Sequence, residues 1–346
     1  MSELPIWEER EQPTTRLIDV RTPLRDYATL PETDFEQNSD YLAWINEYKE
    51  ALHGTFHKVQ PLTVERLEAR DINLKEVIAA VSDVVERPAY PSHRVISHYD
   101  MRHDRMYKMA AEDGFFPSNM KLSNGGPAYG QFEYILHFVR LRASYINKAP
   151  RSSVVDTLAF ALGHASVNNL TYTHLERAES GNTVYHWYGA SWRWDDQYYG
   201  EVLDDASAAK VAAESRQLLG VTTPGPASLH PLVEHYREAS GFSTAAVGAM
   251  ALDLINRAAG HSDSLGVYRS LWSYMTNGQN DASRQELAAT VIRATQGAMT
   301  LEELELETKQ SDQRGMSLTM LQRVEEACGI TGSEQPSRHL SRTDFY

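Results

Sequence analysis

The chain has 346 residues, 42% hydrophobic and 23% charged, which is typical of an ordered globular protein and excludes a disordered one. Its 33 Lys and Arg against 47 Asp and Glu leave a net charge of −14, which excludes a protein that coats nucleic acid by overall attraction. Cys328 is the only cysteine, so an intrachain disulfide is excluded and a reducing compartment is favoured. The acidic N-terminus is unlike a signal peptide, and the sequence contains no long apolar run. We therefore expect a cytoplasmic chain without a membrane partner.

Residues 1–40 are predicted to form an extended N-terminal arm. Four prolines interrupt this segment, and proline removes a backbone donor and is excluded from helix interiors. Trp7 and several aliphatic residues nevertheless make the arm apolar enough to dock on a surface. Because docked arms often belong to exchange between subunits, we expect Trp7 to contribute to a subunit interface.

Helical periodicity begins after the arm and defines a first helical core part, residues 41–170. Apolar spacing predicts a helix that starts at Tyr41 and ends at Gly54, since glycine is the preferred residue after a helix C-terminus. Asn73 and Glu76 form a capping box that predicts another helix start. Two further apolar stripes predict helices over residues 132–146 and 155–165.

The second half of the chain shows the same helical periodicity. The whole sequence therefore predicts a mainly α protein of about ten helices. Residues 228–330 are expected to form a second helical core part, followed by a tail over 331–346, and residues 171–227 an insertion between the two core parts. The helices predicted from spacing and capping in this half are 205–220, 228–240, 243–259, 264–276, 283–298 and 317–328.

The insertion contains the stretch TVYHWYGASWRWDDQYYG, residues 183–200, which holds seven of the 33 aromatic residues. Alternation around Gly189-Ala190 predicts a two-residue β-hairpin in which Trp187 faces Trp192. The rings expected on one face of this hairpin are Tyr185, Trp187, Trp192 and Trp194. This face can pack on the protein's own helices, form a subunit interface, or stack a neutral ligand; the acidic residues that follow disfavour phosphate.

Positive charge gathers between Arg87 and Arg151, where Lys and Arg outnumber Asp and Glu. The residues that can form one basic stripe here are Arg94, Arg102, Arg105 and Lys108. Such a stripe is either a solvated surface or a patch that contacts RNA phosphates, and neutralising phosphates with Lys and Arg is what drives RNA binding.

The sequence predicts no catalytic residues, no metal site and no cofactor, and we expect the chain not to be an enzyme. Phosphate-binding, dinucleotide-binding and Gly-x-Ser-x-Gly motifs are missing. One alternative is a metal-dependent phosphohydrolase of the His-Asp type, built on the adjacent His103 and Asp104. Its remaining ligands would be His53, His57 and Asp156. Another alternative is a soluble binding module that uses the aromatic hairpin.

The chain resembles the coat proteins of the partitiviruses, the plant cryptic viruses in particular. The resemblance is in its size, its acidity, its proline-rich arm and the aromatic-rich segment within a helical chain. The segments that carry the resemblance are GFFPSNMKLSNGGPAYGQFEYILHFVRLRASYI, residues 114–146, and the helical block 228–299. The resemblance implies a helical shell domain with a small protruding domain, formed by 171–227. It also implies homodimers that self-assemble into an icosahedral virion around double-stranded RNA in the host cytoplasm, with weak electrostatic contacts to the genome.

Overall fold

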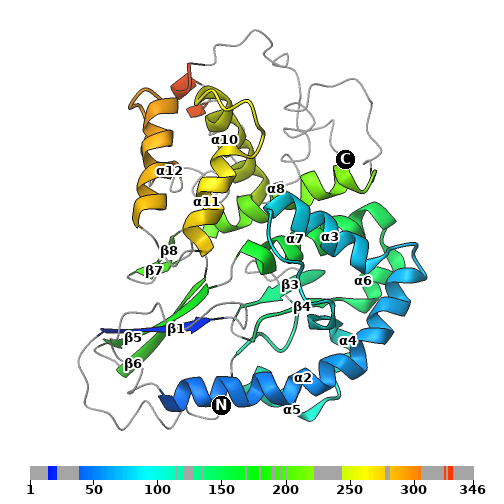
Figure 1. Ribbon diagram of the computed structural model, residues 1–346. Helices are drawn as coiled ribbons and strands as arrows, with labels where there is room; N and C mark the ends of the chain where they lie inside the picture. Colours follow the sequence, from blue (N-terminus) through cyan, green and yellow to red (C-terminus); the bar gives the residue numbers. More distant parts are fainter. Residues whose placement is uncertain are drawn as a thin grey trace, which may run out of the picture.

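The structure is a computed structural model, and within its described residues the chain is mainly helical, as the sequence predicted (Figure 1). Ten α-helices and eight short strands are formed there. None of the described helices combines the length and the apolar composition that crossing a bilayer requires. The residues described are 15–21, 39–113, 115–120, 128–134, 136–167, 170–178, 181–188, 192–194, 197–199, 201–221, 244–276, 281–301, 303–304, 323–324 and 326–329.

The first long helix, α2 (Ser39–Glu68), runs through two residues that ordinarily end helices. The predicted end at Gly54 is wrong, because the helix continues past Gly54 and past Pro61 to Glu68. A glycine inside a helix costs only about 1 kcal/mol relative to alanine. Burial of Leu52 and Phe56 on either side of Gly54 offsets that cost.

The next helix, α3 (Leu74–Val85), begins where its capping box predicted. The Asn73 side chain accepts hydrogen bonds from the backbone N–H groups of Lys75 and Glu76, at 3.0 and 3.5 Å. The helix ends at Glu86, whose φ of 54° lies in the left-handed region, directly before Arg87-Pro88. Local capping chemistry therefore decides both ends of α3.

Residues 132–146, predicted as one helix, instead form two strands and a short helix. These are β3 (Gly130–Glu133), β4 (Phe138–Leu141) and α6 (Ala143–Lys148). Strand β4 is central, antiparallel to β3 and parallel to β2 (Val95–Ser97). All four residues of β4 are buried, and a short run buried on both faces has no strand alternation that a sequence reading can detect.

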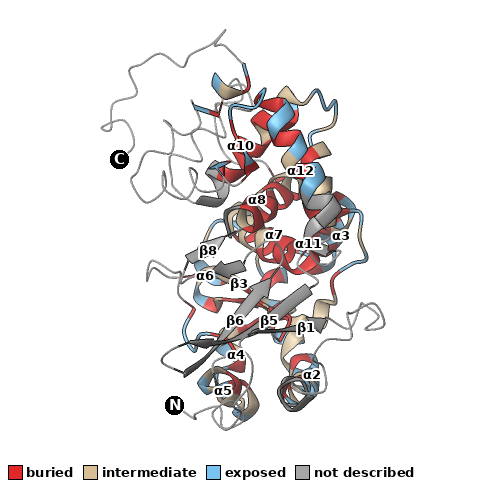
Figure 2. Cartoon of the chain, turned by 90° about the vertical axis from the view of Figure 1, so that its left-hand side faces the viewer, coloured by how far each residue is buried: buried red, intermediate tan, exposed pale blue. Residues whose placement is uncertain are grey.

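The helical body is built around α7 (Arg151–Val167) and α8 (Glu201–Leu218), most of whose residues are buried where burial is described (Figure 2). Gly163 of α7 lets the two helices approach closely, since a Cβ at this position would lie 3.2 Å from the Cα of Ala208. α8 therefore packs in the same core as α7, although it falls within residues 171–227, which the sequence predicted as an insertion.

Three further helices complete this body: α10 (Thr244–Ala258), α11 (Gly266–Thr276) and α12 (Asp281–Ala294). They match the helices predicted for 243–259, 264–276 and 283–298. The helix predicted over 228–240 and the tail 331–346 lie outside the described residues, as does most of 317–328.

The predicted aromatic hairpin is not formed, although its two segments are strands. β6 (Gly181–Tyr188) pairs with β5 (Leu170–Ala178), so that Trp187 lies opposite Tyr172. β7 (Trp192–Trp194) pairs with β8 (Gln197–Tyr199), so that Trp192 lies opposite Tyr199. Both strands of the predicted hairpin thus have other partners, and the turn chemistry of Gly189-Ala190 did not decide the pairing.

Part of the N-terminal arm is a strand of the sheet that contains β5 and β6. β1 (Thr15–Arg21) pairs antiparallel with β5, from Thr15 opposite Glu176 to Arg21 opposite Leu170. The resulting order is β1-β5-β6, and the sheet extends from the left side of the helical body in Figure 1. The arm therefore docks on the segment 170–188 of its own chain, while Trp7 lies outside the described residues.

Candidate functional site

The basic segment of the chain lies against helix α2. It comprises the 3-10 turn η3 (Ser92–Arg94), β2, α4 (His98–Met101) and α5 (Arg105–Glu112). A shared apolar core holds this segment to α2 and to β4, and its members include Leu52 and Phe56 of α2 and Phe138 of β4. Side chains of α2 that flank this core are thereby placed beside η3.

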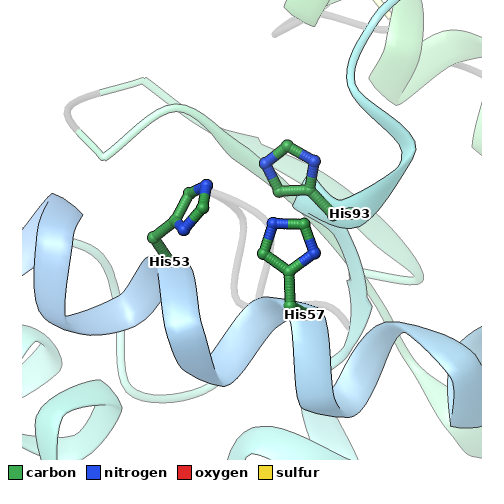
Figure 3. A group of neighbouring side chains, drawn as sticks. All are labelled: His53, His57 and His93. Carbon is green, nitrogen blue, oxygen red and sulfur yellow. The ribbon is translucent and has the colours of Figure 1, made fainter.

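Three histidines converge at the contact between α2 and η3 (Figure 3). His53 and His57 are one helical turn apart on α2, and His93 comes from η3. One nitrogen from each ring lies within 4.8 Å of the other two. The rings of His57 and His93 are stacked with centroids 4.3 Å apart, and His53 lies edge-on to both. His53 and His57 are exposed to solvent, whereas His93 is partly buried.

A ring nitrogen of His93 is available as an electron-pair donor. Burial and the neighbouring His57 and Arg94 lower the pKa of His93 to about 4, so this ring is neutral at neutral pH. The Nε2 atom of His93 is buried and has no hydrogen-bond partner among the described residues. An unpaired buried nitrogen of this kind favours a bound group that supplies the missing interaction.

Positive charge surrounds the histidine cluster on the side of β4. The Arg94 guanidinium donates a hydrogen bond of 3.1 Å to the carbonyl oxygen of His137, a residue held at a φ of 57°. Burial, together with Arg94, lowers the pKa of Lys49 to about 8. Burial, then Arg94 and Lys49, lowers the pKa of His137 well below its ordinary value. Lys49 precedes His53 by one turn on α2, so two cationic side chains, Lys49 and Arg94, lie near the histidine cluster.

The predicted RNA-facing patch is divided by the structure. Arg102, Arg105 and Lys108 are exposed, and no carboxylate forms an ion pair with any of them within the described part of the chain. The Arg102 guanidinium lies 3.7 Å from the centre of the half-exposed Tyr99 ring. Arg94, in contrast, is partly buried beside His137 and belongs to the neighbourhood of the histidine cluster.

Buried polar contacts fix the position of the patch on the sheet. Arg140 of β4 is fully buried and forms an ion pair with Glu133 of β3. Its guanidinium also donates to the carbonyl oxygen of Pro117 at 2.8 Å and to the Tyr107 hydroxyl at 3.5 Å. The same hydroxyl lies 2.8 Å from Nδ1 of His98, so α4 and α5 are both connected to β4.

The ligand set of the His-Asp phosphohydrolase alternative is not assembled. Asp104 is the N-cap of α5, where it accepts the Tyr107 backbone N–H at 2.9 Å. Asp156 pairs instead with Arg216 of α8, at 3.1 Å. His103 accepts a hydrogen bond from Arg102, and it is not part of the convergent histidine group. Of the five residues proposed as metal ligands of that site, only His53 and His57 belong to the convergent histidine group.

The predicted interface residues lie on two separate sheets. Tyr185 and Trp187 are on β6, in the sheet that contains β1, and Trp192 and Trp194 are on β7.

Sequence reasoning missed His93 as the third member of the histidine cluster. The spacing of four between His53 and His57 places them on one helix face only because α2 continues past Gly54, where the sequence predicted its end. No sequence pattern connects His93 to them, because it lies far along the chain on a different element.

Comparison with known proteins places no relative beside this chain. No protein-family model, no curated protein and no solved structure matches it.

Proposed function

We propose that the chain is a capsid protein, not an enzyme, that forms homodimers and assembles from them into an icosahedral shell around double-stranded RNA. The proposal rests on the partitivirus resemblance of the sequence. The structural observation that supports it best is the β1-β5-β6 sheet, in which a strand of the N-terminal arm joins the aromatic-rich segment at the side of the helical body (Figure 1).

This sheet supplies a surface suited to a second copy of the chain. Within the described residues β1 and β6 are its outer strands, so each has one backbone edge with no strand beside it. Such edges pair readily with strands of other chains, and soluble proteins ordinarily cover or blunt them. The segment 183–200 is rich in Tyr and Trp, the residues most enriched at protein interfaces. We therefore assign dimer contacts to this sheet and to the adjacent β7–β8 pair, with Trp7, Tyr185, Trp187, Trp192 and Trp194 as contributors.

The exposed cations of the α4–α5 region support a genome contact. Arg105 and Lys108 are exposed charges that can meet phosphates, and Arg102, which donates to His103 and lies over the Tyr99 ring, adds a third. A few such contacts per chain bind RNA weakly, but many copies lining a shell bind it together. The net charge of −14 requires this local arrangement, because the chain as a whole repels phosphate.

Measurement of particle mass tests the proposal. The untagged full chain, studied by size-exclusion chromatography with light scattering over a range of concentrations, should form particles many times heavier than its 39.0 kDa. Electron microscopy should show closed shells, and RNA recovered with them should resist nuclease. A chain that stays monomeric at every concentration contradicts the proposal.

Two variants connect assembly to the sheet. Deletion of residues 1–21, which removes β1, and the double substitution Trp187→Ala with Trp192→Ala should each yield smaller species that keep the helical circular dichroism of the wild type. The matched control is Tyr129→Ala, which removes an aromatic ring that is 42% exposed outside this sheet and should leave assembly intact. Equal assembly by all variants would remove the sheet from the contact.

A further inference from the structure

The histidine cluster between α2 and η3 has the composition of a metal site. Three ring nitrogens from two different elements approach one another, and within the described residues no carboxylate or thiol joins the group. Adjacent positively charged rings repel, so three histidines gather stably when they remain neutral or share a ligand that each can donate to. Imidazole nitrogens are preferred ligands of zinc, copper and nickel ions.

We propose that His53, His57 and His93 bind one divalent transition-metal ion, zinc in particular, with a fourth coordination position open to solvent. This site goes beyond the capsid function and does not depend on it. Three histidines and one open position make up a recognised coordination set for zinc. The fourth position is open because His53 and His57 are both exposed.

The geometry requires only side-chain rotation. In a tetrahedral zinc site with Zn–N bonds of about 2.0–2.1 Å, the ligand nitrogens lie roughly 3.3 Å apart. The nitrogens in the cluster lie within 4.8 Å of one another, so closure moves them by about 1 Å. The stacked rings of His57 and His93 must turn so that one nitrogen of each faces the ion. The exposed ring of His57 is free to do so.

Lys49 and Arg94 decide what completes the coordination. Both are cationic groups near the cluster, and Arg94 directly follows His93 in η3. Their charge opposes a bare dication and favours an anion bound to it. We therefore assign the open position to hydroxide or a small oxyanion such as phosphate. A bound ion would also connect α2 to η3 and stabilise the docking of α2 on the core.

Metal binding is measured on the untagged full chain after treatment with a chelator and dialysis. Titration with Zn²⁺ by calorimetry should give one ion per chain. Co²⁺ should develop the visible d–d absorption of a tetrahedral site, a readout that surface binding does not produce. Zn²⁺ should raise the midpoint of thermal unfolding, because an ion that binds only the folded chain stabilises it.

The variants His53→Gln and His57→Gln carry the test, since both side chains are exposed and their loss leaves the core intact. Each should weaken Zn²⁺ binding at least about tenfold and abolish the Co²⁺ absorption. His93→Gln should do the same, with its fold checked by circular dichroism. The matched control is His103→Gln, an exposed histidine outside the cluster, which should bind as the wild type does.

Three outcomes overturn the proposal. The first is a wild-type chain that binds no Zn²⁺ at micromolar concentrations, and the second is equal binding by the His53→Gln and His57→Gln variants and the wild type. The third is loss of binding in His103→Gln, which would move the metal to the His103–Asp104 pair. Assembly is measured in the same preparations, so failure of this site is distinguishable from failure of the capsid proposal.

Discussion

The ammonium group of Lys210 on α8 lies 3.0 Å from a carboxylate oxygen of Asp253 on α10, inside the helical body. Lys210 is 7% exposed, and it also pairs with Glu214 at 3.1 Å. The Tyr268 hydroxyl of α11 donates to the same Asp253 oxygen at 3.1 Å. Three helices that the sequence predicted separately thus meet at the Lys210–Asp253 pair.

Removal of this lysine should destabilise the chain strongly. In Lys210→Met the Asp253 carboxylate loses its cation while it remains largely buried, and breaking a buried pair in this way costs about 3 kcal/mol or more. Urea unfolding followed by circular dichroism measures the loss. The control is Arg269→Met, which breaks the exposed pairs with Glu86 and Asp263 and should cost less than about 1 kcal/mol. Equal losses in both variants would contradict the assigned burial.

Two helical glycines should respond to alanine in opposite directions. The Cβ of Gly163→Ala would lie 3.2 Å from both the Cα of Ala208 and the Cβ of Val211, forcing α7 and α8 apart at a cost of about 1–3 kcal/mol. Gly54→Ala on α2 meets nothing within 4 Å and should stabilise by about 0.5–1 kcal/mol. Thermal unfolding of both variants provides the comparison. A stabilising Gly163→Ala would mean that the helices are less closely packed than the structure has them.

The contribution of His98 to the stability of the chain should fall as the pH drops below about 6.5. Burial, followed by the charges of Arg140, Arg142 and Arg102, lowers the pKa of His98 from 6.5 to about 4. The unfolded chain therefore takes up a proton before the folded chain does, and stability present above pH 6.5 is lost toward pH 4. His93 and His137 act in the same direction, whereas Glu133, whose pKa burial raises to about 7, acts in the opposite direction.

Replacement of His98 isolates its share of this pH dependence. His98→Gln keeps a hydrogen-bond partner for the Tyr107 hydroxyl but does not titrate. Its free energy of unfolding should decline less steeply between about pH 7 and 5 than that of the wild type, measured by urea unfolding at each pH. Parallel curves for the two proteins would show that His98 is not held neutral by its surroundings.

Charge removal from the α4–α5 region should weaken RNA binding. The triple variant Arg102→Gln, Arg105→Gln, Lys108→Gln should reduce the salt dependence of binding to double-stranded RNA, by about one unit of log–log slope for each phosphate that is no longer neutralised. A control with the same change in net charge replaces exposed cations elsewhere: Lys75→Gln, Lys148→Gln, Arg257→Gln. Identical slopes in the two triples, from filter binding over a salt series, would remove this patch from the RNA interface.

Features that depend on neighbouring residues in the chain could be predicted well. Asn73 begins α3 as its capping box indicates, and the helices near 243–259 and 264–276 follow from apolar spacing and flanking glycines. Capping and amphipathic periodicity act over one or two turns. The residues that determine such features are therefore close to one another in the sequence.

Features that depend on distant partners were predicted wrongly. The run at Phe138 is a strand because β2 and β3 lie on either side of it, and neither partner is visible in the local pattern. Trp187 lies opposite Tyr172 instead of Trp192 because β5 supplies a longer strand than β7 does. α8 belongs to the core because α7 offers it Gly163, where the backbones can come close.

The sequence by itself determined the mainly helical class, the acidic balance, the positions of the capped helices and the spacing of four residues between His53 and His57. Only the tertiary structure decided that His93 joins His53 and His57, that Arg94 contacts His137 instead of forming a stripe with Arg102, and that Asp156 pairs with Arg216. The physical reason is the range of the interactions involved. Caps and periodicity are local, whereas a three-residue site exists only once packing of α2 on η3 has brought distant segments together.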